Sequence, residues 1–364
     1  MDMLEKYARL LVDYCLEIRE GDRLLIRTTT AAEPLVREVY RMATRSGAQV
    51  FTDLAIEGQG RMLIDEAPDS ILDREDPFFL EAMQSFECYL AILAPYNLKE
   101  MAGVDKDRMA RRSRANQQAQ EIYFKRIADK SLRRSLCQYP TIAQAQDSGM
   151  STEAYTRFVY EACRLFDDDP VAAWLDVRAM QQRIVDHLNQ CSEIHYEGKH
   201  IDLTFSTRGR TWINSDGRNN MPSGEVFTSP VEDSVNGKVH FSYPGLYQGH
   251  EVAGVTLWVK DGWIERWEAE SGQAFLDHIF AQDGTRRFGE AAIGTNDRIQ
   301  QMSRNILFDE KIGGTIHLAI GQSYLQCGGQ NKSAVHWDMI TDMTKDGRIK
   351  ADGQLIYENG RFLI

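Results

Sequence analysis

The chain has 364 residues, of which 43% are hydrophobic, and a net charge of -12. This length allows two domains with sizeable cores, and the composition is that of a globular protein rather than a disordered or fibrous one. The acidic balance argues against nucleic-acid binding. No apolar run approaches the ~20 residues of a membrane-spanning helix, and residues 1–6 lack the layout of a signal peptide. We therefore expect a cytoplasmic protein without membrane association.

The first part of the chain alternates between helical and strand patterns. Apolar residues spaced by three and four predict helices over residues 4–17 and 34–46, and residues 23–27 and 49–52 predict strands. Residues 88–94 form a continuous apolar run, which is typical of a buried parallel strand. This βα alternation predicts a small doubly wound parallel sheet.

Two features of this part could suggest a ligand, and both favour a plainer interpretation. Residues 28–32 follow the first predicted strand without a glycine-rich phosphate loop, so nucleotide binding has no support. Residues 106–130 form a basic helical stretch, but its interleaved acidic residues indicate a solvated face rather than a nucleic-acid site. We expect this part to be a scaffold.

Residues 151–189 have a helical pattern that begins with Ser151 as an N-cap and is interrupted by three aspartates at 167–169. Three consecutive carboxylates cannot converge on one ion from a short loop, and the following Pro170 is favoured in the first turn of a helix. The aspartates therefore indicate a helix start. We do not expect them to bind a metal.

After Cys191 the pattern changes to strands and hairpins. Residues 194–197 and 201–205 predict strands, and an Asp-Gly turn within residues 255–264 predicts a hairpin. Residues 349–364 predict a terminal hairpin. We expect an α/β amino-terminal domain with a helical extension over residues 1–190, and an α+β, antiparallel-strand-rich domain over residues 191–364.

Potential metal ligands interrupt apolar stretches in this second part. His317 lies in TIHLA, and His336 and Asp338 form an H-x-D pair. Residues two apart in a strand share a face, so this pair could hold one ion while Trp337 faces away. Glu225 and Glu290 each follow a glycine, where the backbone can turn sharply. Histidine nitrogen combined with carboxylate oxygen suits zinc, cobalt or manganese.

Each of these residues also has a plainer interpretation. His317 alone could be a hydrogen-bonded core histidine. Glu225 could cap a helix, and Glu290 could pair with Arg286 or Arg287. The joint pattern carries the argument, because two glutamates, two histidines and an aspartate supply enough ligands for two divalent ions.

The stretch from about residue 211 to 343 resembles the catalytic half of the metallo-aminopeptidases of the aminopeptidase T and aminopeptidase S type. The segments that carry the resemblance are NNMPSGEVFT (219–228), FGEAAIGTN (288–296), EKIGGTIH (310–317) and HWD (336–338), in the family's order and with similar gaps. The resemblance implies a two-metal centre of zinc, cobalt, manganese or magnesium. Its implied ligands are Glu225, Glu290, His317, His336 and Asp338.

The resemblance also implies an activity, which is removal of the first residue of peptides that have a free N-terminus. Two ions would lower the pKa of a shared water, and the resulting hydroxide would attack the first peptide carbonyl. Glu290 is our choice for the bridging ligand, with Asp338 as the other candidate. Tyr324, close to the ions, could donate a hydrogen bond, bind a metal or be an ordinary half-buried tyrosine. The family's enzymes imply a homodimer whose partner helps to enclose the cleft.

Two other functions remain open at this point. A related branch holds one iron with a His-His-Asp set and opens a dihydroxypyridine ring, for which His317, His336 and Asp338 would serve. A single-iron dioxygenase has no use for Glu225 and Glu290, however. A catalytically silent relative would have lost ligands, and none is missing. The sequence therefore favours a metallo-aminopeptidase.

The six cysteines lack C-x-x-C spacing and are expected to be small core residues. Cys327 is the exception, because it lies close in sequence to Tyr324. It could line the site or, much less favoured, act as a nucleophile.

Overall fold

The computed structural model describes residues 2–364, which form two compact units. The first unit contains the residues up to Ala173 together with Gly217–Pro222. The second contains Trp174–Asp216 and Ser223–Ile364.

The structural division lies earlier than the expected boundary between residues 190 and 191. Most of helix α10 (Pro170–Leu188) belongs to the second unit. Ile184, Val185 and Leu188 of this helix are buried in the core of that unit. The sequence pattern of α10 is helical like that of the preceding segment, so the pattern alone could not show with which sheet the helix packs.

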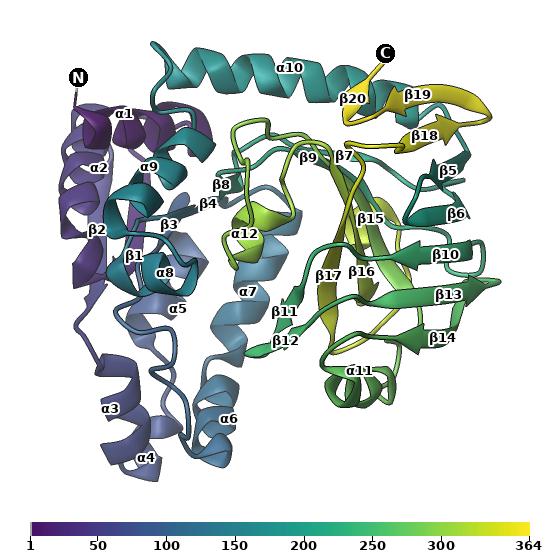
Figure 1. Ribbon diagram of the computed structural model, residues 1–364. Helices are drawn as coiled ribbons and strands as arrows, with labels where there is room; N and C mark the ends of the chain where they lie inside the picture. Colours follow the sequence, from purple (N-terminus) through teal and green to yellow (C-terminus); the bar gives the residue numbers. More distant parts are fainter. Residues whose placement is uncertain (1) are drawn as a thin grey trace. The chain divides into compact units, whose positions relative to one another are not determined.

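The first unit is built on a parallel sheet with the strand order β2-β1-β3-β4-β8 (Figure 1). Leu24 and Ile26 of β1 point to one face and Leu25 to the other, and all three are fully buried. A parallel strand covered by helices on both faces has this pattern. The strands are β1 (Arg23–Thr29), β2 (Gln49–Ala55), β3 (Cys88–Leu93), β4 (Arg133–Gln138) and β8 (Asn220–Met221).

The helices of the first unit cover this sheet. Leu25 packs against Phe79 of α5 and Ala119 of α7. The helix predicted over residues 4–17 is an α-helix that continues as a π-helical segment, Leu10–Cys15. The helices are α1 (Met3–Arg9), α2 (Glu33–Arg45), α3 (Gln59–Glu66), α4 (Asp69–Leu72), α5 (Pro77–Ser85), α6 (Lys106–Ala115), α7 (Gln117–Ala128), α8 (Ile142–Asp147) and α9 (Thr152–Ala162).

Local sequence signals account for several of these elements. Ser151 caps α9 by accepting a hydrogen bond from the Ala154 amide, as predicted. Asp169, the last of the three aspartates, accepts a hydrogen bond from the Val171 amide at the start of α10. On the basic helix α6, Arg111 forms ion pairs with Asp69 and Asp73. These pairs are consistent with a solvated, charge-paired face.

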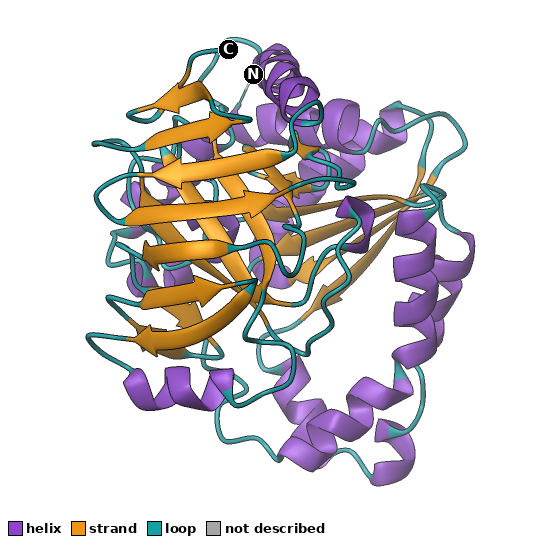
Figure 2. Ribbon diagram, turned by 90° about the vertical axis from the view of Figure 1, so that its right-hand side faces the viewer, coloured by secondary structure: helices purple, strands orange, loops and turns teal. Residues whose placement is uncertain are grey.

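The second unit contains two larger antiparallel sheets and a small hairpin (Figure 2). The eight-stranded sheet has the order β14-β13-β10-β6-β5-β18-β19-β20. Its strands are β5 (Glu193–Glu197), β6 (Ile201–Ser206), β10 (Asn236–His240), β13 (Thr256–Lys260), β14 (Trp263–Glu268), β18 (Arg348–Ala351), β19 (Gln354–Glu358) and β20 (Arg361–Phe362).

The five-stranded sheet of this unit has the order β17-β16-β15-β9-β7. Its strands are β7 (Ile213–Ser215), β9 (Glu225–Thr228), β15 (Phe288–Gly294), β16 (Thr315–Gly321) and β17 (His336–Asp342). The remaining elements are the hairpin of β11 (Gly245–Tyr247) and β12 (His250–Val252), and helices α11 (Gln273–Phe280) and α12 (Ile306–Asp309).

A single hydrophobic core joins the two sheets of the second unit. Leu203 and Leu257 of the eight-stranded sheet share it with Ile316 and Leu318 of the five-stranded sheet. The predicted Asp-Gly turn joins β13 and β14, with both turn residues at positive φ. The predicted fold class, a parallel α/β sheet followed by an antiparallel-strand-rich part, is confirmed.

Candidate metal centre

The five-stranded sheet has one hydrocarbon face and one polar face. Ile316 and Leu318 of β16 are in the hydrophobic core, while His317 between them points to the opposite face. On β17, Trp337 is in the core, and its neighbours His336 and Asp338 share the polar face. Strand periodicity therefore places these ligand candidates together on the face away from the core.

A β-bulge puts Glu290 on the same polar face. Phe288 pairs with Ile320 of β16, but Glu290 already pairs with Ala319, so β15 contains one extra residue at Gly289. Without a bulge, residues 288 and 290 would share a face. Because of the bulge, Phe288 is buried in the core and Glu290 faces the site.

The glycines before the two glutamates have different roles. Gly224, before Glu225, has φ +116°, and a Cβ there would lie 2.8 Å from Asn296 Cβ. It provides the sharp turn that the sequence predicted. Gly289 lies inside β15 instead, and a Cβ there would lie 2.2 Å from the Gln322 carbonyl oxygen. The expectation of a turn at this position was wrong, because the glycine is needed for a close approach between two backbone segments.

Glu225 is the first residue of β9, and a buried glutamine fixes its main chain. The Gln181 side chain of α10 donates hydrogen bonds to the main-chain oxygens of Ser215 and Glu225, at 3.0 and 3.1 Å. Its own carbonyl oxygen accepts a hydrogen bond from Thr295 Oγ1 at 2.8 Å. Gln181 thus ties α10 to β7, to β9 and to the segment that follows β15.

The structure brings all six predicted site residues together. His317 Nε2 lies 3.4 Å from Glu225 Oε2 and 3.8 Å from Glu290 Oε1. His336 Nε2 lies 3.2 Å from Glu290 Oε2 and 3.6 Å from Asp338 Oδ1. Tyr324 Oη lies 3.4 Å from His336 Nε2. We call the five residues other than the tyrosine the histidine–carboxylate cluster; they are Glu225, Glu290, His317, His336 and Asp338.

The chemistry of the cluster fits a metal ion. Ligand atoms of Glu290, His317 and Asp338 all lie within 4.8 Å of one another. Three buried atoms of the cluster, Glu225 Oε2, His317 Nδ1 and Asp338 Oδ1, have no hydrogen-bond partner among residues 2–364. Buried polar atoms in native proteins are normally satisfied, and carboxylate oxygen and imidazole nitrogen are the ligands that borderline divalent ions prefer.

The surroundings of His336 fix the orientation of its ring. His336 Nδ1 lies 2.8 Å from the Gln322 carbonyl oxygen, which can only accept a hydrogen bond, so Nδ1 is the donor. In the neutral imidazole this leaves the lone pair on Nε2, which faces Glu290 and Asp338. Tyr324 packs its ring against that of His336, with 5.1 Å between the centroids.

Charge in the cluster shifts the pKa values of its members. Burial opposes protonation of His317, but its hydrogen bond to Glu290 and the charge of Glu225 outweigh this effect and raise its pKa to about 9. Burial likewise opposes protonation of His336, but Asp338 and Glu290 raise its pKa to about 12. The negative charge of Glu290, followed by burial, raises the pKa of Tyr324. The phenol is therefore protonated at neutral pH and can donate a hydrogen bond.

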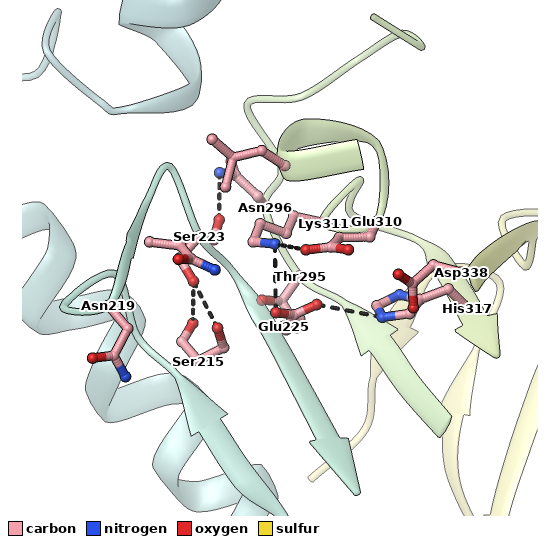
Figure 3. Close-up of polar contacts among 12 residues, drawn as sticks. Ser215, Asn219, Ser223, Glu225, Thr295, Asn296, Glu310, Lys311, His317 and Asp338 are labelled. Carbon is pink, nitrogen blue, oxygen red and sulfur yellow. Dashed lines mark hydrogen bonds and ion pairs between the residues drawn. The ribbon is translucent and has the colours of Figure 1, made fainter. Parts of the chain in front are cut away.

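Two charged residues next to the cluster were not predicted to have a role. Lys311 is fully buried, and its Nζ lies 3.5 Å from Glu225 Oε1 and donates a hydrogen bond to Glu310 Oε1 (Figure 3). Burial raises the pKa of Glu310 to about 8, although the charge of Lys311 opposes the rise. The only sequence signal was the position of this charged pair at the start of EKIGGTIH, just before the strand that carries His317.

The structure bears on two alternatives, an arginine ion pair for Glu290 and a nucleophilic role for Cys327. Arg286 and Arg287 donate to the main-chain oxygens of Ile264 and Glu232, and no ion pair joins either arginine to Glu290 within residues 2–364. Cys327 is buried, and burial raises the pKa of its thiol to about 12. The raised pKa argues against a thiolate nucleophile, and Cys327 packs as a small hydrophobic residue.

The histidine–carboxylate cluster defines a candidate metal centre on the polar face of an antiparallel sheet, the kind of site that a metal-dependent hydrolase requires. Comparison with known protein families agrees: residues 1–362 match the thermophilic metalloprotease (M29) family. The chain belongs to this family, and the prediction of a metallo-aminopeptidase-type hydrolase is confirmed at this level.

Individual relatives support the same assignment over the whole chain. Aminopeptidase 2 of Geobacillus stearothermophilus is 31% identical, with 95% of each chain covered. Aminopeptidase AmpS of Bacillus subtilis is 27% identical, with 99% of this chain and 98% of the relative covered. The structure of AmpT from Thermus thermophilus superposes with a TM-score of 0.84 at 25% identity and covers 100% of this chain and 99% of that one.

The comparisons do not test every prediction made from the sequence. Divalent metal use follows from the family, while the number and identity of the ions stay predictions, as do the homodimer and the cytoplasmic location. Nothing in the matches supports the dioxygenase alternative. Within residues 2–364, every helix is too short or too polar to cross a membrane.

Proposed function

We propose that the protein is an aminopeptidase that removes the N-terminal residue of peptides with two divalent ions held by the histidine–carboxylate cluster. The observation that carries this proposal is the convergence of three carboxylates and two imidazoles on one sheet face, where two buried carboxylate oxygens, Glu225 Oε2 and Asp338 Oδ1, have no hydrogen-bond partner among residues 2–364. When bound, such ions supply Lewis acidity and lower the pKa of water into the neutral range. The names of the relatives, all aminopeptidases, support the choice of substrate.

We assign Glu290 as the residue shared by the two ions. Its Oε1 faces His317 and its Oε2 faces His336, at 3.8 and 3.2 Å from the respective Nε2 atoms. With one oxygen near each imidazole, Glu290 would be a ligand that the two ions could share. Asp338 Oδ1 lies 3.6 Å from His336 Nε2, and Asp338 also offers an oxygen within 4.8 Å of ligand atoms of Glu290 and His317, so Asp338 would be the other candidate for the shared ligand.

The remaining residues orient the substrate and move protons. Tyr324, whose pKa is raised by the charge of Glu290, keeps its proton and donates a hydrogen bond to the carbonyl oxygen of the first peptide bond as negative charge develops there. Glu310, with a pKa raised by burial to about 8, holds a proton at neutral pH and can donate it to the leaving amine, after which the proton released by the attacking water restores the acid. The surplus of carboxyl groups in the site favours a substrate that carries a free ammonium group.

The test combines metal content with hydrolysis of aminoacyl chromogenic amides. Two ions per chain, hydrolysis of the free-amine substrates and rejection of their N-acetylated forms are expected. A single iron without amide hydrolysis would contradict the proposal and favour the ring-opening oxygenase.

The variant Tyr324→Phe separates the two roles of the phenol. If Tyr324 is a hydrogen-bond donor, the variant should keep its full metal content and have a kcat about tenfold to a hundredfold lower. If Tyr324 is a metal ligand, the variant should lose metal.

A further inference from the structure

Lys311 is an unusual residue for the interior of a protein. Its side chain is fully buried within a loop that follows α12 and precedes β16. Lysine is rarely buried completely unless it is paired, because removing an ammonium group from water is costly. The pairing is with Glu225 and Glu310, so the charge of Lys311 is directed at the metal centre.

The two oxygens of Glu225 have different surroundings. Oε1 lies 3.5 Å from Lys311 Nζ. Oε2 lies on the other side, 3.4 Å from His317 Nε2, and is buried without a hydrogen-bond partner among the described residues. Figure 3 shows the resulting row, in which Glu310, Lys311, Glu225 and His317 follow one another.

We propose that Lys311 is a positioning residue that occupies Oε1 of Glu225, so that Glu225 presents a single oxygen, Oε2, to the metal centre. This inference rests on the proposed metal-binding function of the cluster. An ammonium group held against one oxygen withdraws that oxygen from coordination and reduces the negative charge that Glu225 offers. Lys311 therefore limits the number of protein ligands and keeps the bound metal more electrophilic.

The charges around the metal centre predict in which direction replacement of Lys311 changes the affinity for metal. Carboxyl groups of Glu225, Glu290, Asp338 and Glu310 surround the site, and Lys311 adds one positive charge beside them. Replacing Lys311 by an apolar residue removes a repulsion between like charges and frees Oε1. The metal should then bind more tightly and with a higher coordination number, although the centre becomes a poorer catalyst. A lysine that only supported the fold would give the opposite result, a loss of metal affinity.

The experiment compares Co²⁺ binding to the metal-free wild type, Lys311→Met and Lys345→Met. Lys345 is exposed, so its replacement removes the same charge from the surface. For Lys311→Met we expect a Co²⁺ dissociation constant about tenfold lower, together with weaker visible absorption, as a higher coordination number produces. The Lys345→Met protein should match the wild type in both measurements. A folded Lys311→Met protein with unchanged affinity and spectrum, or with lost affinity, would overturn the proposal.

A second variant covers the case in which Lys311→Met does not fold. Glu310→Gln keeps the lysine and removes its other partner, so Lys311 pairs with Glu225 alone and Co²⁺ binding should weaken severalfold. Unchanged binding in this variant would also overturn the role of Lys311. A wild-type protein that binds no Co²⁺ would instead refute the proposed metal centre itself, so the two failures can be distinguished.

Discussion

Among single residues, Glu290 gives the sharpest test of the proposed metal centre, because its carboxylate faces two histidines at once. Its two oxygens lie near different imidazole nitrogens, and the glutamate is only 4% exposed. The amide of glutamine has the same shape but carries no charge and presents one NH₂ group where an oxygen is needed.

The variant Glu290→Gln should therefore lose metal and activity while keeping its fold. We expect kcat/KM to fall by roughly 10³-fold or more and metal content to drop clearly, with an unchanged far-UV circular dichroism spectrum. The control is Glu265→Gln, which removes the same charge from an exposed position on β14 and should behave like the wild type. Full activity in Glu290→Gln would contradict the assignment of a shared ligand.

At the scale of elements, the bulge in β15 connects two ligands through the backbone. Gly289 lies against the Gln322 carbonyl group, and the same carbonyl oxygen accepts the hydrogen bond from His336 Nδ1. A side chain at residue 289 would push on the acceptor that orients His336. Backbone packing at the bulge and geometry in the metal centre are therefore linked.

The variant Gly289→Ala should damage both stability and activity. Its Cβ would lie 2.2 Å from the Gln322 oxygen, so the backbone must shift. We expect a loss of about 1–3 kcal/mol in the free energy of unfolding and kcat/KM lower by at least about tenfold. Gly60→Ala is the matched control, because nothing lies within 4 Å of a Cβ there and α3 favours alanine. Equal behaviour of the two variants in denaturant melts and kinetics would refute the link.

An ion pair at the starts of β1 and β3 predicts how the parallel sheet responds to acid. Arg23 donates hydrogen bonds to both carboxylate oxygens of Glu87, and these lower the pKa of Glu87 from 4.5 to about 2. A lowered pKa contributes stability above the unfolded-state value, and that stability is lost as the pH falls from about 4.5 towards 2. Both side chains are 37% exposed, so water screens much of the interaction.

The variant Glu87→Gln should thus be less stable at pH 7 by about 1 kcal/mol or less. The difference from the wild type should shrink as the pH falls through this window. Glu57→Gln, at an exposed position that forms no ion pair within residues 2–364, is the control. Urea melts at pH 7, 4 and 2.5 measure the effect, and a stability difference as large at pH 2.5 as at pH 7 would refute it.

Particular residues show how far the sequence could predict the site. His336 and Asp338 were assigned to one strand face because they lie two residues apart, and His317 was singled out because it interrupts an apolar run; both patterns are visible in the sequence itself. The bulge at Gly289 depends on pairing with β16, a strand some 30 positions away in the sequence, so no local pattern could reveal it. Lys311 was missed for a similar reason. Only the folded loop buries its ammonium group; in the sequence it resembles any solvent-exposed lysine.

At the scale of the whole molecule, the metal centre and the hydrophobic core use opposite faces of the same sheet. None of the cluster residues belongs to the core shared by the two antiparallel sheets. Removal of the ions should therefore abolish activity and leave both units folded.

Dialysis against a chelator tests this expectation. Activity should disappear and return when divalent ions are added back, while circular dichroism stays unchanged. The melting temperature should fall by several degrees, since each ion at a hundred times its dissociation constant contributes only about 2.7 kcal/mol. Complete unfolding in the chelator would show that the ions hold the fold together, contrary to the arrangement of the two faces.

The alternation of faces along β16 also constrains how relatives of this chain can diverge. One residue inserted between Thr315 and Ile316, with the preceding chain held in register, would turn the imidazole into the hydrocarbon interior and Ile316 into the site. Length changes during evolution should therefore be absent from the ligand-bearing strands and gather in the connecting loops. Substrate preference can drift by remodelling those loops, while the strands that carry the ligands keep a fixed length.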